Sequence, residues 1–442
     1  SVEDTDSIKE VVKLYKKLGD LGLVAQQIIE KNHKKNTNKL VINDVFAKLS
    51  EIAEDGGEGS QDRKVEALYQ LLTNLEPLSA KYVVRIVIGK LRLGFSTMTI
   101  IDALSWAMTE SKDESQAIED AYQKKADLGE IAQEYLAIED KEVRLKKLEE
   151  ISVQAGIPVV PALCSRLNSS EEIIAKMGEV YAEPKFDGLR VQVHFRKTKH
   201  GFKVSAFTRN LEDISHMFPE LDHAAQILNC DSCVLDTEAI GYDPETGKLV
   251  EFQKTMTRKR KHNVDETAQS VPIRFYVFDI LELDKKTLLD KKLRERKDLL
   301  KNLFDKNEVL FKTEYIQTNN PAQLRSFHEE QLANGLEGAV MKKVDATYIS
   351  GRKGWSWVKI KEEEGSRGKL SDTLDVIVMG YYAGRGKRNQ FGIGAVLVGV
   401  IDEQENIRTI AKIGTGLTED QLKEMKKKCD DLATEEKPSS YQ

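Results

Sequence analysis

The hydrophobic pattern of the chain changes at Ile157-Pro-Val-Val-Pro161, and this change most limits what the chain can fold into. Before it, apolar residues recur at the spacing of one helix face and proline is scarce. After it, short runs rich in β-branched and aromatic residues alternate with helical stretches. Two closely spaced prolines resist both a helix and a central strand, so we expect a linker here. A chain of 442 residues also exceeds the roughly 250 residues at which single cores stop growing.

These patterns predict three domains, with boundaries at 1–165, 166–367 and 368–442. The first is all-α and the second is α+β. In the third, apolar strands at 375–382 and 395–401 flank a basic, glycine-rich loop, which indicates the opening of a small β-barrel. In the second domain we expect strands at 190–195, 203–208, 233–242, 273–281 and 338–342, and helices at 293–304 and 321–333.

A helical hairpin is expected near residue 90. A helical pattern over 82–93 ends at Gly94, and Ser96 can cap a second helix. The turn between them presents Lys90, Arg92 and the backbone amides of a helix start, and Gly94 permits close approach. We interpret it as a phosphate contact, and a solvated turn is the alternative.

A lysine suited to covalent chemistry lies in Ala182-Glu-Pro-Lys-Phe-Asp-Gly-Leu-Arg190. Lys185 precedes an aspartate and a glycine just ahead of a valine-rich strand, which places its amine at a loop that can approach a phosphate closely. Such an amine must lose its proton before it can attack phosphorus, and burial or nearby cations favour that loss. Alone, the four-residue pattern is weak, and a surface Lys–Asp pair explains it better.

Five further segments follow in a fixed order. They are Phe207-Thr-Arg-Asn-Leu-Glu212, Leu235-Asp-Thr-Glu-Ala239, Tyr276-Val-Phe-Asp-Ile280, Glu337-Gly-Ala-Val-Met-Lys342 and Trp357-Val-Lys-Ile-Lys361. With the lysine segment, this set resembles the nucleotidyltransferase motifs of the ATP-dependent DNA ligases of archaeal and eukaryotic type. The resemblance implies a multidomain fold with an all-α DNA-binding domain, an α+β adenylyltransferase domain (ATP-grasp-like nucleotidyltransferase) and a partial β-barrel OB-fold domain.

The resemblance also implies roles for the matched residues around the nucleotide. Lys185 would be the catalytic nucleophile that forms a lysine–AMP phosphoramidate. Glu183 would lie against the adenine edge, and Phe278 would stack on the base unless it is only a buried strand residue. Two fork-shaped cations would reach ribose and phosphate, namely Arg190 and Arg209.

Two carboxylates and three lysines complete the implied site. Glu238 would touch the ribose or a Mg²⁺ ion, and Glu337 would help to hold Mg²⁺ beside the phosphates. Solvated glutamates at strand ends are the alternative. Three cations would neutralise the triphosphate, and the last two of them share a strand face by period-two geometry: Lys342, Lys359 and Lys361.

The implied reaction is ATP-dependent sealing of nicked double-stranded DNA, and the flanking segments favour DNA as the substrate. Gly89-Lys-Leu-Arg-Leu-Gly94 with Thr99-Ile-Ile-Asp-Ala-Leu104 is similar to the ligase DNA-binding domain. Asp372-Thr-Leu-Asp375 and Gly384-Arg-Gly-Lys-Arg388 are similar to the start of the ligase OB domain. The alternatives are an RNA ligase or capping-type nucleotidyltransferase, and a truncated DNA-binding fragment with little catalysis.

Because the net charge is −6, any affinity for nucleic acid must come from local basic patches. The segment 254–262 has no acidic residue and carries Lys254, Arg258 and Arg260, which we predict to contact DNA unless the loop is merely solvated. The glycine-rich loop supplies three further predicted contacts, Arg385, Lys387 and Arg388. Alternating Lys and Glu at 145–150 and 288–297 instead predict helix surfaces.

Composition narrows the class of protein. Hydrophobic residues make up 40% and charged residues 32%, no apolar run nears the roughly 18 residues of a membrane span, and no signal segment is visible. We therefore expect an intracellular protein that does not enter membranes. The resemblance further implies a monomer with a sliding clamp as a further partner, cytoplasmic if archaeal and nuclear if eukaryotic. Cys230 and Cys233 form a lone CxxC and are expected to be packing thiols rather than zinc ligands.

The resemblance breaks off at both ends of the chain. The family's last motif has no counterpart before Gln442, and the helical region opens part-way through the matching domain. The first and third domains are therefore expected to be incomplete, and a chain that truly ended there would accept AMP from ATP slowly.

Overall fold

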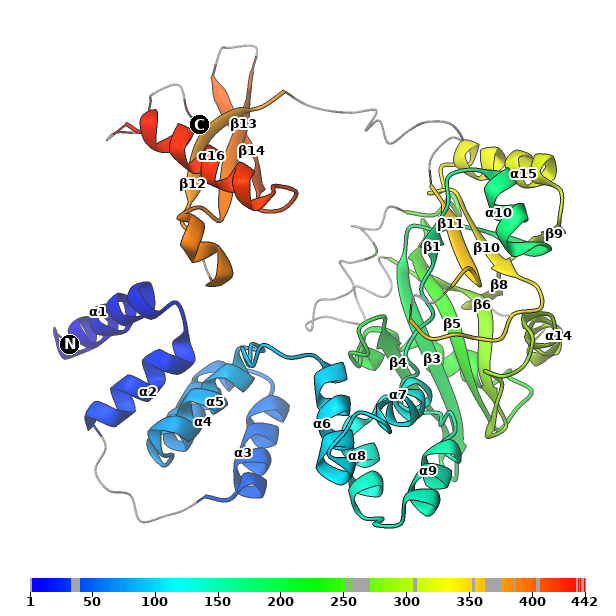
Figure 1. Ribbon diagram of the computed structural model, residues 1–442, viewed down its shortest axis with the longest axis horizontal. Helices are drawn as coiled ribbons and strands as arrows, with labels where there is room; N and C mark the ends of the chain where they lie inside the picture. The colour runs from blue at the N-terminus through cyan, green and yellow to red at the C-terminus, as the bar shows by residue number, and fades with distance from the viewer. Residues whose placement is uncertain are drawn as a thin grey trace. The chain divides into compact units, whose positions relative to one another are not determined.

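The computed structural model describes residues 2–32, 40–250, 255, 271–304, 308–351, 354–361, 375–384, 386–402, 406–434, 436, 438 and 441. The chain divides into two compact units, Ser1–Gly94 with Leu370–Gln442, and Phe95–Lys369 (Figure 1). The three domain boundaries stay predictions. Within the described ranges, every helix is too short or too polar to span a membrane.

The first unit opens with helices. They are α1 (Val2–Leu18), α2 (Leu21–Asn32), α3 (Ile42–Glu54), α4 (Ser60–Thr73) and α5 (Pro77–Val87). Helices α2 and α5 pack closely because Gly22 lacks a side chain: a Cβ there would lie 2.6 Å from the Lys81 carbonyl oxygen. A buried ion pair between Arg85 and Asp20, 2.6 Å long, also joins them. Helical structure before the linker is thus confirmed.

The first helix of the predicted hairpin ends at Val87, not at 93. Gly89 has a φ of +65°, and the amides of Gly89 and Lys90 donate back to the carbonyls of Ile86 and Arg85. This is the hydrogen-bond pattern with which a glycine ends a helix, so Gly89 stops the helix before Gly94 can. As predicted, α6 (Thr97–Thr109) begins directly after Ser96.

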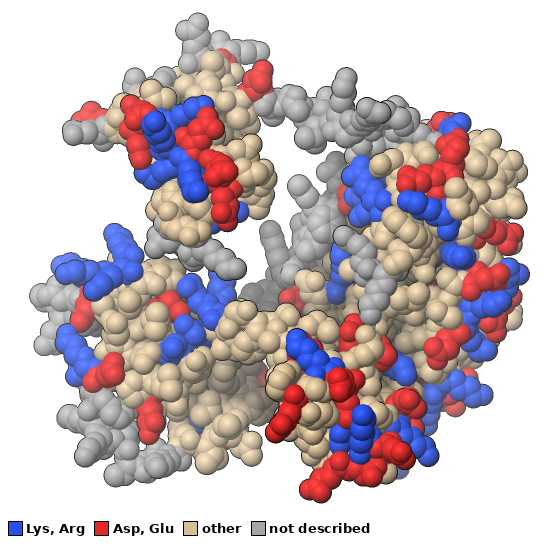
Figure 2. All heavy atoms as spheres, viewed as in Figure 1, with Lys and Arg blue, Asp and Glu red and all other residues tan. Residues whose placement is uncertain are grey.

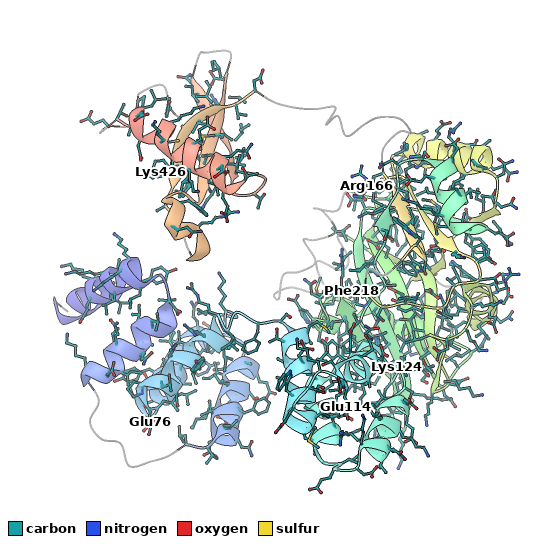
Figure 3. All side chains as sticks on the ribbon, in the orientation of Figure 1. Glu76, Glu114, Lys124, Arg166, Phe218 and Lys426 are labelled. Carbon is teal, nitrogen blue, oxygen red and sulfur yellow. The ribbon has the colours of Figure 1, made fainter. Side chains whose placement is uncertain are left out.

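Helices α6 to α9 open the second unit. The last three are α7 (Ser115–Lys124), α8 (Leu128–Leu136) and α9 (Lys141–Glu149). They enclose the apolar side chains of Ile101, Ile118 and Ile131. Glu114, labelled in Figure 3, accepts hydrogen bonds from Arg144 and from the Tyr135 hydroxyl, which satisfy its buried charge.

Two sheets form the rest of this unit. The first has the order β1-β11-β10-β2-β9 and the second β4-β3-β5-β6-β7, with β8 paired to β6. The strands of the first are β1 (Ser165–Arg166), β2 (Val180–Pro184), β9 (Ile316–Thr318), β10 (Ala339–Lys343) and β11 (Trp357–Ile360). Those of the second are β3 (Leu189–Thr198), β4 (Gly201–Thr208), β5 (Ser232–Gly241), β6 (Ile273–Leu283), β7 (Lys286–Thr287) and β8 (Leu310–Lys312).

Helices cover each sheet, and the strands and helices predicted for this region are confirmed within a few residues. Helices α10 (Ser170–Met177) and α15 (Pro321–Ala333) pack on the first sheet. Helices α11 (Glu220–Ala225) and α14 (Leu293–Leu303) pack on the second. Cys233 lies in that second core and Cys230 packs against it, as expected of packing thiols.

The segment expected as a linker has neither helix nor strand, but it is not a solvated connection. Val159 is fully buried, and the Gln192 side chain accepts from its amide and donates to its carbonyl. Residues 153–162 contribute to a core with Tyr348 and Trp357.

One surface prediction is correct and another is wrong. The charged residues at 146, 147, 149 and 150 are exposed on and after α9, as expected. On α14, however, Arg296 and Lys297 are buried. Each forms an ion pair with a buried carboxylate, Arg296 with Asp279 at 2.8 Å and Lys297 with Glu183 at 2.5 Å. The alternation of charges along α14 does not by itself reveal that buried carboxylates lie opposite the covered face of the helix. Elsewhere on the face shown in Figure 2, basic and acidic side chains are interspersed over this unit.

The C-terminal part of the first unit is a three-stranded antiparallel sheet, β12 (Ile377–Tyr382), β13 (Ala395–Ile401) and β14 (Ile407–Ile413), among its described residues. Its two predicted strands are confirmed. Helix α16 (Glu419–Asp431), which carries Lys426 in Figure 3, buries Leu422 against Val396 and Val398. The OB-fold stays a prediction.

Candidate functional site

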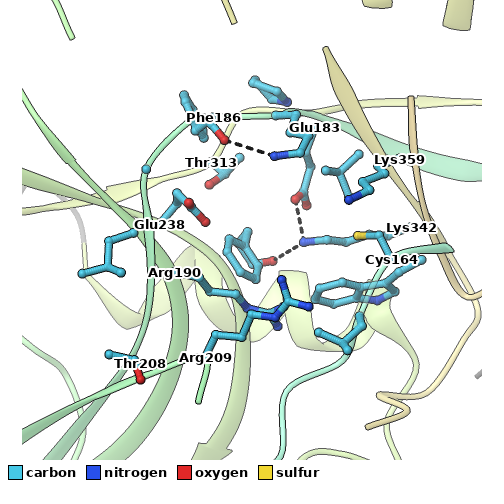
Figure 4. A pocket seen from close by; sticks show the side chains of 18 of the residues that line it. Cys164, Glu183, Phe186, Arg190, Thr208, Arg209, Glu238, Thr313, Lys342 and Lys359 are labelled. Atoms are coloured by element: carbon cyan, nitrogen blue, oxygen red, sulfur yellow. Dashed lines mark hydrogen bonds and ion pairs between the residues drawn. The ribbon is translucent and has the colours of Figure 1, made fainter. Parts of the chain in front are cut away.

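A cavity of about 610 Å³ lies between the two sheets (Figure 4). The first sheet contributes residues of β2, β10 and β11, and the second contributes residues of β3, β5 and β6. Its lining includes acidic, basic and aromatic side chains, among them Glu183, Lys185, Arg190, Glu238, Phe278 and Lys342.

Lys185 directly follows β2 at the mouth of this cavity. Its amide donates to the Gly338 carbonyl, and its carbonyl accepts from the Glu337 amide, so the pairing of β2 with β10 continues to the lysine. Its Nζ lies 2.5 Å from Glu337 Oε2, which Lys361 Nζ also contacts at 2.6 Å. Burial opposes ionisation of Glu337, but these two ammonium groups outweigh it and hold the pKa of Glu337 below its usual value.

Gly188 closes the loop that begins at Lys185. A Cβ at this position would lie 2.7 Å from the Ala239 carbonyl oxygen and 2.7 Å from Ile240 Cγ1. The glycine is thus required because the loop runs against β5. This close approach to the protein's own strand explains the residue without reference to a phosphate.

Glu183 lies on β2 between two buried lysines. Lys297 of α14 contacts one carboxylate oxygen at 2.5 Å, and Lys342 of β10 contacts the other at 2.6 Å. Burial lowers the pKa of Lys342, while the negative charge of Glu183 partly restores it. The Glu183 carboxylate is therefore fixed in place by one lysine of a helix and one lysine of a strand. It remains a hydrogen-bond acceptor that lines the cavity.

Arg190 is held by a network that the sequence did not reveal. Asp236 of β5 accepts from its Nε at 2.9 Å and from its second terminal nitrogen at 2.6 Å. The remaining terminal nitrogen donates to the Ala162 carbonyl at 2.6 Å, and Tyr348 donates its hydroxyl to Asp236 at 2.9 Å. This bidentate contact fixes the plane of the guanidinium group.

Glu238 stands next to Arg190 across the β3–β5 pairing. Burial raises the pKa of Glu238 to about 7, although Arg190 and Lys185 lower it in part. Burial therefore disfavours ionisation of this carboxylate, and a cation bound nearby would favour it.

Phe278 presents its ring to the cavity from β6. The Lys342 Nζ lies 4.1 Å from the ring centroid, and the Trp357 ring meets it edge-on at 5.9 Å. Lys359 lines the same wall, where burial and then the charge of Lys361 lower its pKa. A flat ring beneath several cations is suited to a base that carries phosphates.

Comparison with known proteins decides the family. Residues 161–361 match the model described as ATP dependent DNA ligase domain, residues 3–105 match DNA ligase N terminus, and residues 389–442 match ATP dependent DNA ligase C terminal region. A "Probable DNA ligase" of Dictyoglomus turgidum is 39% identical over 437 residues, which cover 98% of this chain and 72% of that protein. The chain belongs to the ATP-dependent DNA ligases.

Other relatives agree. "DNA ligase 2" of Korarchaeum cryptofilum is 37% identical over 432 residues, covering 96% of this ligase and 71% of that protein. A solved structure described as "Pmar-Lig_Pre." shares the fold, with a TM-score of 0.53 at 17% identity over 96% of this chain and 87% of that one. The expected family and multidomain architecture are confirmed, and the RNA-directed and fragment alternatives are not favoured.

The structure brings most predicted nucleotide residues of the ligase together. Glu183, Lys185, Arg190, Arg209, Glu238, Phe278, Lys342 and Lys359 all line the cavity. Glu337 and Lys361 join it through the ion pairs with Lys185 and with each other. Their roles remain proposals.

Those predicted DNA contacts that the structure describes do not line this cavity. Lys90, Arg92, Gly94 and Arg388 belong to the other unit. Arg92 donates to the Gly19 carbonyl at 2.7 Å, and Arg388 donates to the carbonyls of Gly394 and Gly414, so both cations also have structural contacts. Lys254, Arg258, Arg260, Arg385 and the Lys387 side chain lie outside the described residues.

Sequence reasoning about the ligase missed several members of this site. Asp236 and Trp357 lie inside the matched segments. A charged residue such as Asp236 within an apolar strand is itself a signal that a partner exists. Lys297 and Thr313 gave no signal, because only the fold brings Lys297 to Glu183 and Thr313 to the cavity.

Proposed function

We propose that this ligase seals nicks in double-stranded DNA through a lysine–AMP intermediate formed on Lys185. The observation that supports this most is the position of the lysine: it directly follows β2 and lines a cavity that has an aromatic ring, two fixed carboxylates and several cations. Phosphoryl transfer needs positioning and charge neutralisation above all, and this cavity offers both.

In the first step, the Lys185 Nζ attacks the α-phosphorus of ATP. A nitrogen–phosphorus bond forms, the bond from phosphorus to the bridging oxygen breaks, and pyrophosphate leaves with the electron pair. The ammonium group must first lose a proton, which the adjacent Glu337 carboxylate can accept and pass to water, because only the neutral amine has a free electron pair.

The side chains around the lysine would hold the nucleotide. Phe278 would stack on adenine, and Glu183 would accept from its exocyclic amine. Arg190 would reach ribose or phosphate with the N–H groups that are not bonded to Asp236 or to the Ala162 carbonyl. Arg209 would reach phosphate from the loop after β4. Lys342, Lys359 and Lys361 would balance the charge of the triphosphate.

A Mg²⁺ ion fits the two carboxylates of the site. Among the described residues, no cluster of three His, Cys, Asp or Glu side chains is present, but Mg²⁺ commonly takes one or two carboxylates and completes its shell with phosphates and water. Glu238 has the raised pKa of a carboxylate that lacks a full counter-charge, so Glu238 and Glu337 would hold the ion. When bound, it would neutralise phosphate charge.

In the remaining steps, the AMP passes from Lys185 to the 5′-phosphate at the nick, and the 3′-hydroxyl then displaces it. Backbone contacts to the duplex would come from Lys90, Arg92 and Gly94, from Lys254, Arg258 and Arg260, and from Arg385, Lys387 and Arg388. We further propose domains at 1–165, 166–367 and 368–442, the last with an OB-fold. A sliding-clamp partner and a monomeric state stay predictions.

The test is covalent labelling. Incubation with ATP labelled at the α-phosphate and Mg²⁺ should transfer label to the protein, and nicked DNA should then discharge it and become sealed. Lys185→Ala should abolish the label, whereas Lys343→Ala, an exposed lysine of neighbouring β10, should keep it. Label that persists in Lys185→Ala would overturn the assignment. A nicked RNA duplex, tested in parallel, should remain unsealed.

A further inference from the structure

Thr313 carries a buried hydroxyl that faces the nucleotide cavity without a partner. The residue follows β8, is 5% exposed and lines the cavity together with Glu183 and Phe278 (Figure 4). Its Oγ1 has no hydrogen-bond partner in the described structure.

Two other buried threonines of this unit, Thr237 and Thr318, have satisfied hydroxyls. Thr237 donates to the Val191 carbonyl at 2.7 Å, and Thr318 contacts the Gln323 side chain at 2.7 Å. A buried hydroxyl without a partner destabilises a fold, so such groups are uncommon and call for an explanation. A polar atom of a ligand in the cavity would satisfy this one.

The strand pairing places Thr313 beside Phe278. Lys312 pairs with Val277 in the parallel β6–β8 register, and the Thr313 amide donates to the Val277 carbonyl at 2.9 Å. Thr313 and Phe278 directly follow this last pair on their two strands, and both line the cavity. A base stacked on the Phe278 ring therefore meets the Thr313 hydroxyl at its edge.

The opposite side of β6 is occupied by β5, which carries Glu238. In that pairing Glu238 lies opposite Tyr276, whereas Thr313 follows the residue that pairs with Val277 on the other side of β6. Because Phe278 is proposed to stack on the base, the hydroxyl beside it is assigned to the base, and the sugar is the alternative that the experiment below separates.

We propose that the Thr313 hydroxyl binds the edge of the adenine base by donating to one of its ring nitrogens, an inference that rests on the proposed function. Adenine offers a donor amine next to acceptor ring nitrogens. Glu183 is an acceptor only and suits the amine, while a neutral hydroxyl can donate to a ring nitrogen. Thr313 is in this view a determinant of nucleotide affinity that complements Glu183.

The experiment measures self-adenylylation at varied ATP concentrations. Thr313→Val keeps the shape and removes the hydroxyl, so the KM for ATP should rise about tenfold while kcat stays within about twofold. The thermal midpoint without nucleotide should stay equal or rise, because the unsatisfied hydroxyl is gone. Thr313→Ser should restore the KM to within about threefold of wild type, because serine retains the donor.

Two controls separate this role from alternatives. Thr287 of β7 also has a buried hydroxyl without a partner but does not line the cavity, so Thr287→Val should leave the KM for ATP unchanged. The factor lost in Thr313→Val should be the same for ATP and for 2′-deoxy-ATP. Loss of the effect with the deoxy nucleotide would move the contact to the sugar and overturn the proposal, as would a wild-type KM in Thr313→Val.

A wild-type chain that forms no Lys185–AMP would refute the proposed function itself. A wild-type chain that forms it, together with a Thr313→Val variant that binds ATP normally, would refute only the role of Thr313.

Discussion

The variant Lys297→Met tests whether the ion pair with Lys297 of α14 holds the Glu183 carboxylate in place. Lys297 reaches from α14 to Glu183 at 2.5 Å, and its side chain is 3% exposed. Its Nζ also lies 4.7 Å from the centroid of the Tyr315 ring. Methionine keeps the length and apolar character of the side chain, so the substitution removes mainly the charge.

The expected loss in the free energy of unfolding depends on the ion pair that Glu183 keeps. Removal of one partner from a buried ion pair costs about 3–5 kcal/mol when the other is left uncompensated. Glu183 keeps Lys342 at 2.6 Å. We therefore expect a smaller loss, about 2 kcal/mol. In a unit of this size that corresponds to a fall of about 4–8 °C in the thermal midpoint.

Thermal and urea unfolding, followed by circular dichroism, measure this loss. Lys301→Ala is the matched control, since Lys301 lies on the same helix and its ion pair with Asp298 is exposed. It should change stability by less than about 0.5 kcal/mol. Lys297→Arg should recover part of the loss. If Lys297→Met unfolds at the same temperature as Lys301→Ala, the buried contact does not hold Glu183 and the reasoning is wrong.

Three further predictions concern the same cavity. Gly188→Ala should lose about 1–3 kcal/mol in urea unfolding, because its Cβ would meet the Ala239 carbonyl at 2.7 Å, whereas Gly380→Ala, with open space around it, should be neutral. Asp236→Asn should lose about 3 kcal/mol and raise the KM for ATP, because the Arg190 charge is left buried without its counter-charge; an unchanged KM would argue against a role for Arg190 in nucleotide binding. The pKa of Glu238 is raised from 4.5 to about 7, so the folded state binds more protons than the unfolded one between these values. The stability of wild type relative to Glu238→Gln should therefore fall by up to about 3 kcal/mol as pH rises through this window and then level off, and a pH-independent difference in unfolding would contradict the assignment.

The elements that could be predicted from sequence were those with local signals. The β5 and β6 strands follow from runs of β-branched residues, and Ser96 marks the start of α6 because its neighbours also favour a helix. The end of α5 was misplaced because two glycines competed, and the nearer one, Gly89, already completes the terminating hydrogen bonds.

The residues whose roles could not be predicted are those whose partners lie far away in the sequence. Lys297 resembles any surface lysine of an amphipathic helix, and only the packing of α14 on the sheets brings it to Glu183. In the same way, nothing local distinguishes Thr313 from Thr318, although one hydroxyl faces the cavity and the other is satisfied. The order of the motifs could identify Lys185 as the nucleophile. The side chains that hold the site around it can be found only from the fold.

The most direct test is mass spectrometry of peptides from the chain after incubation with ATP and Mg²⁺. The account predicts a single AMP on the peptide that contains Lys185, which nicked DNA removes as the nick becomes sealed. Sealing that proceeds with AMP on another residue, or with no adduct at any time, would contradict it.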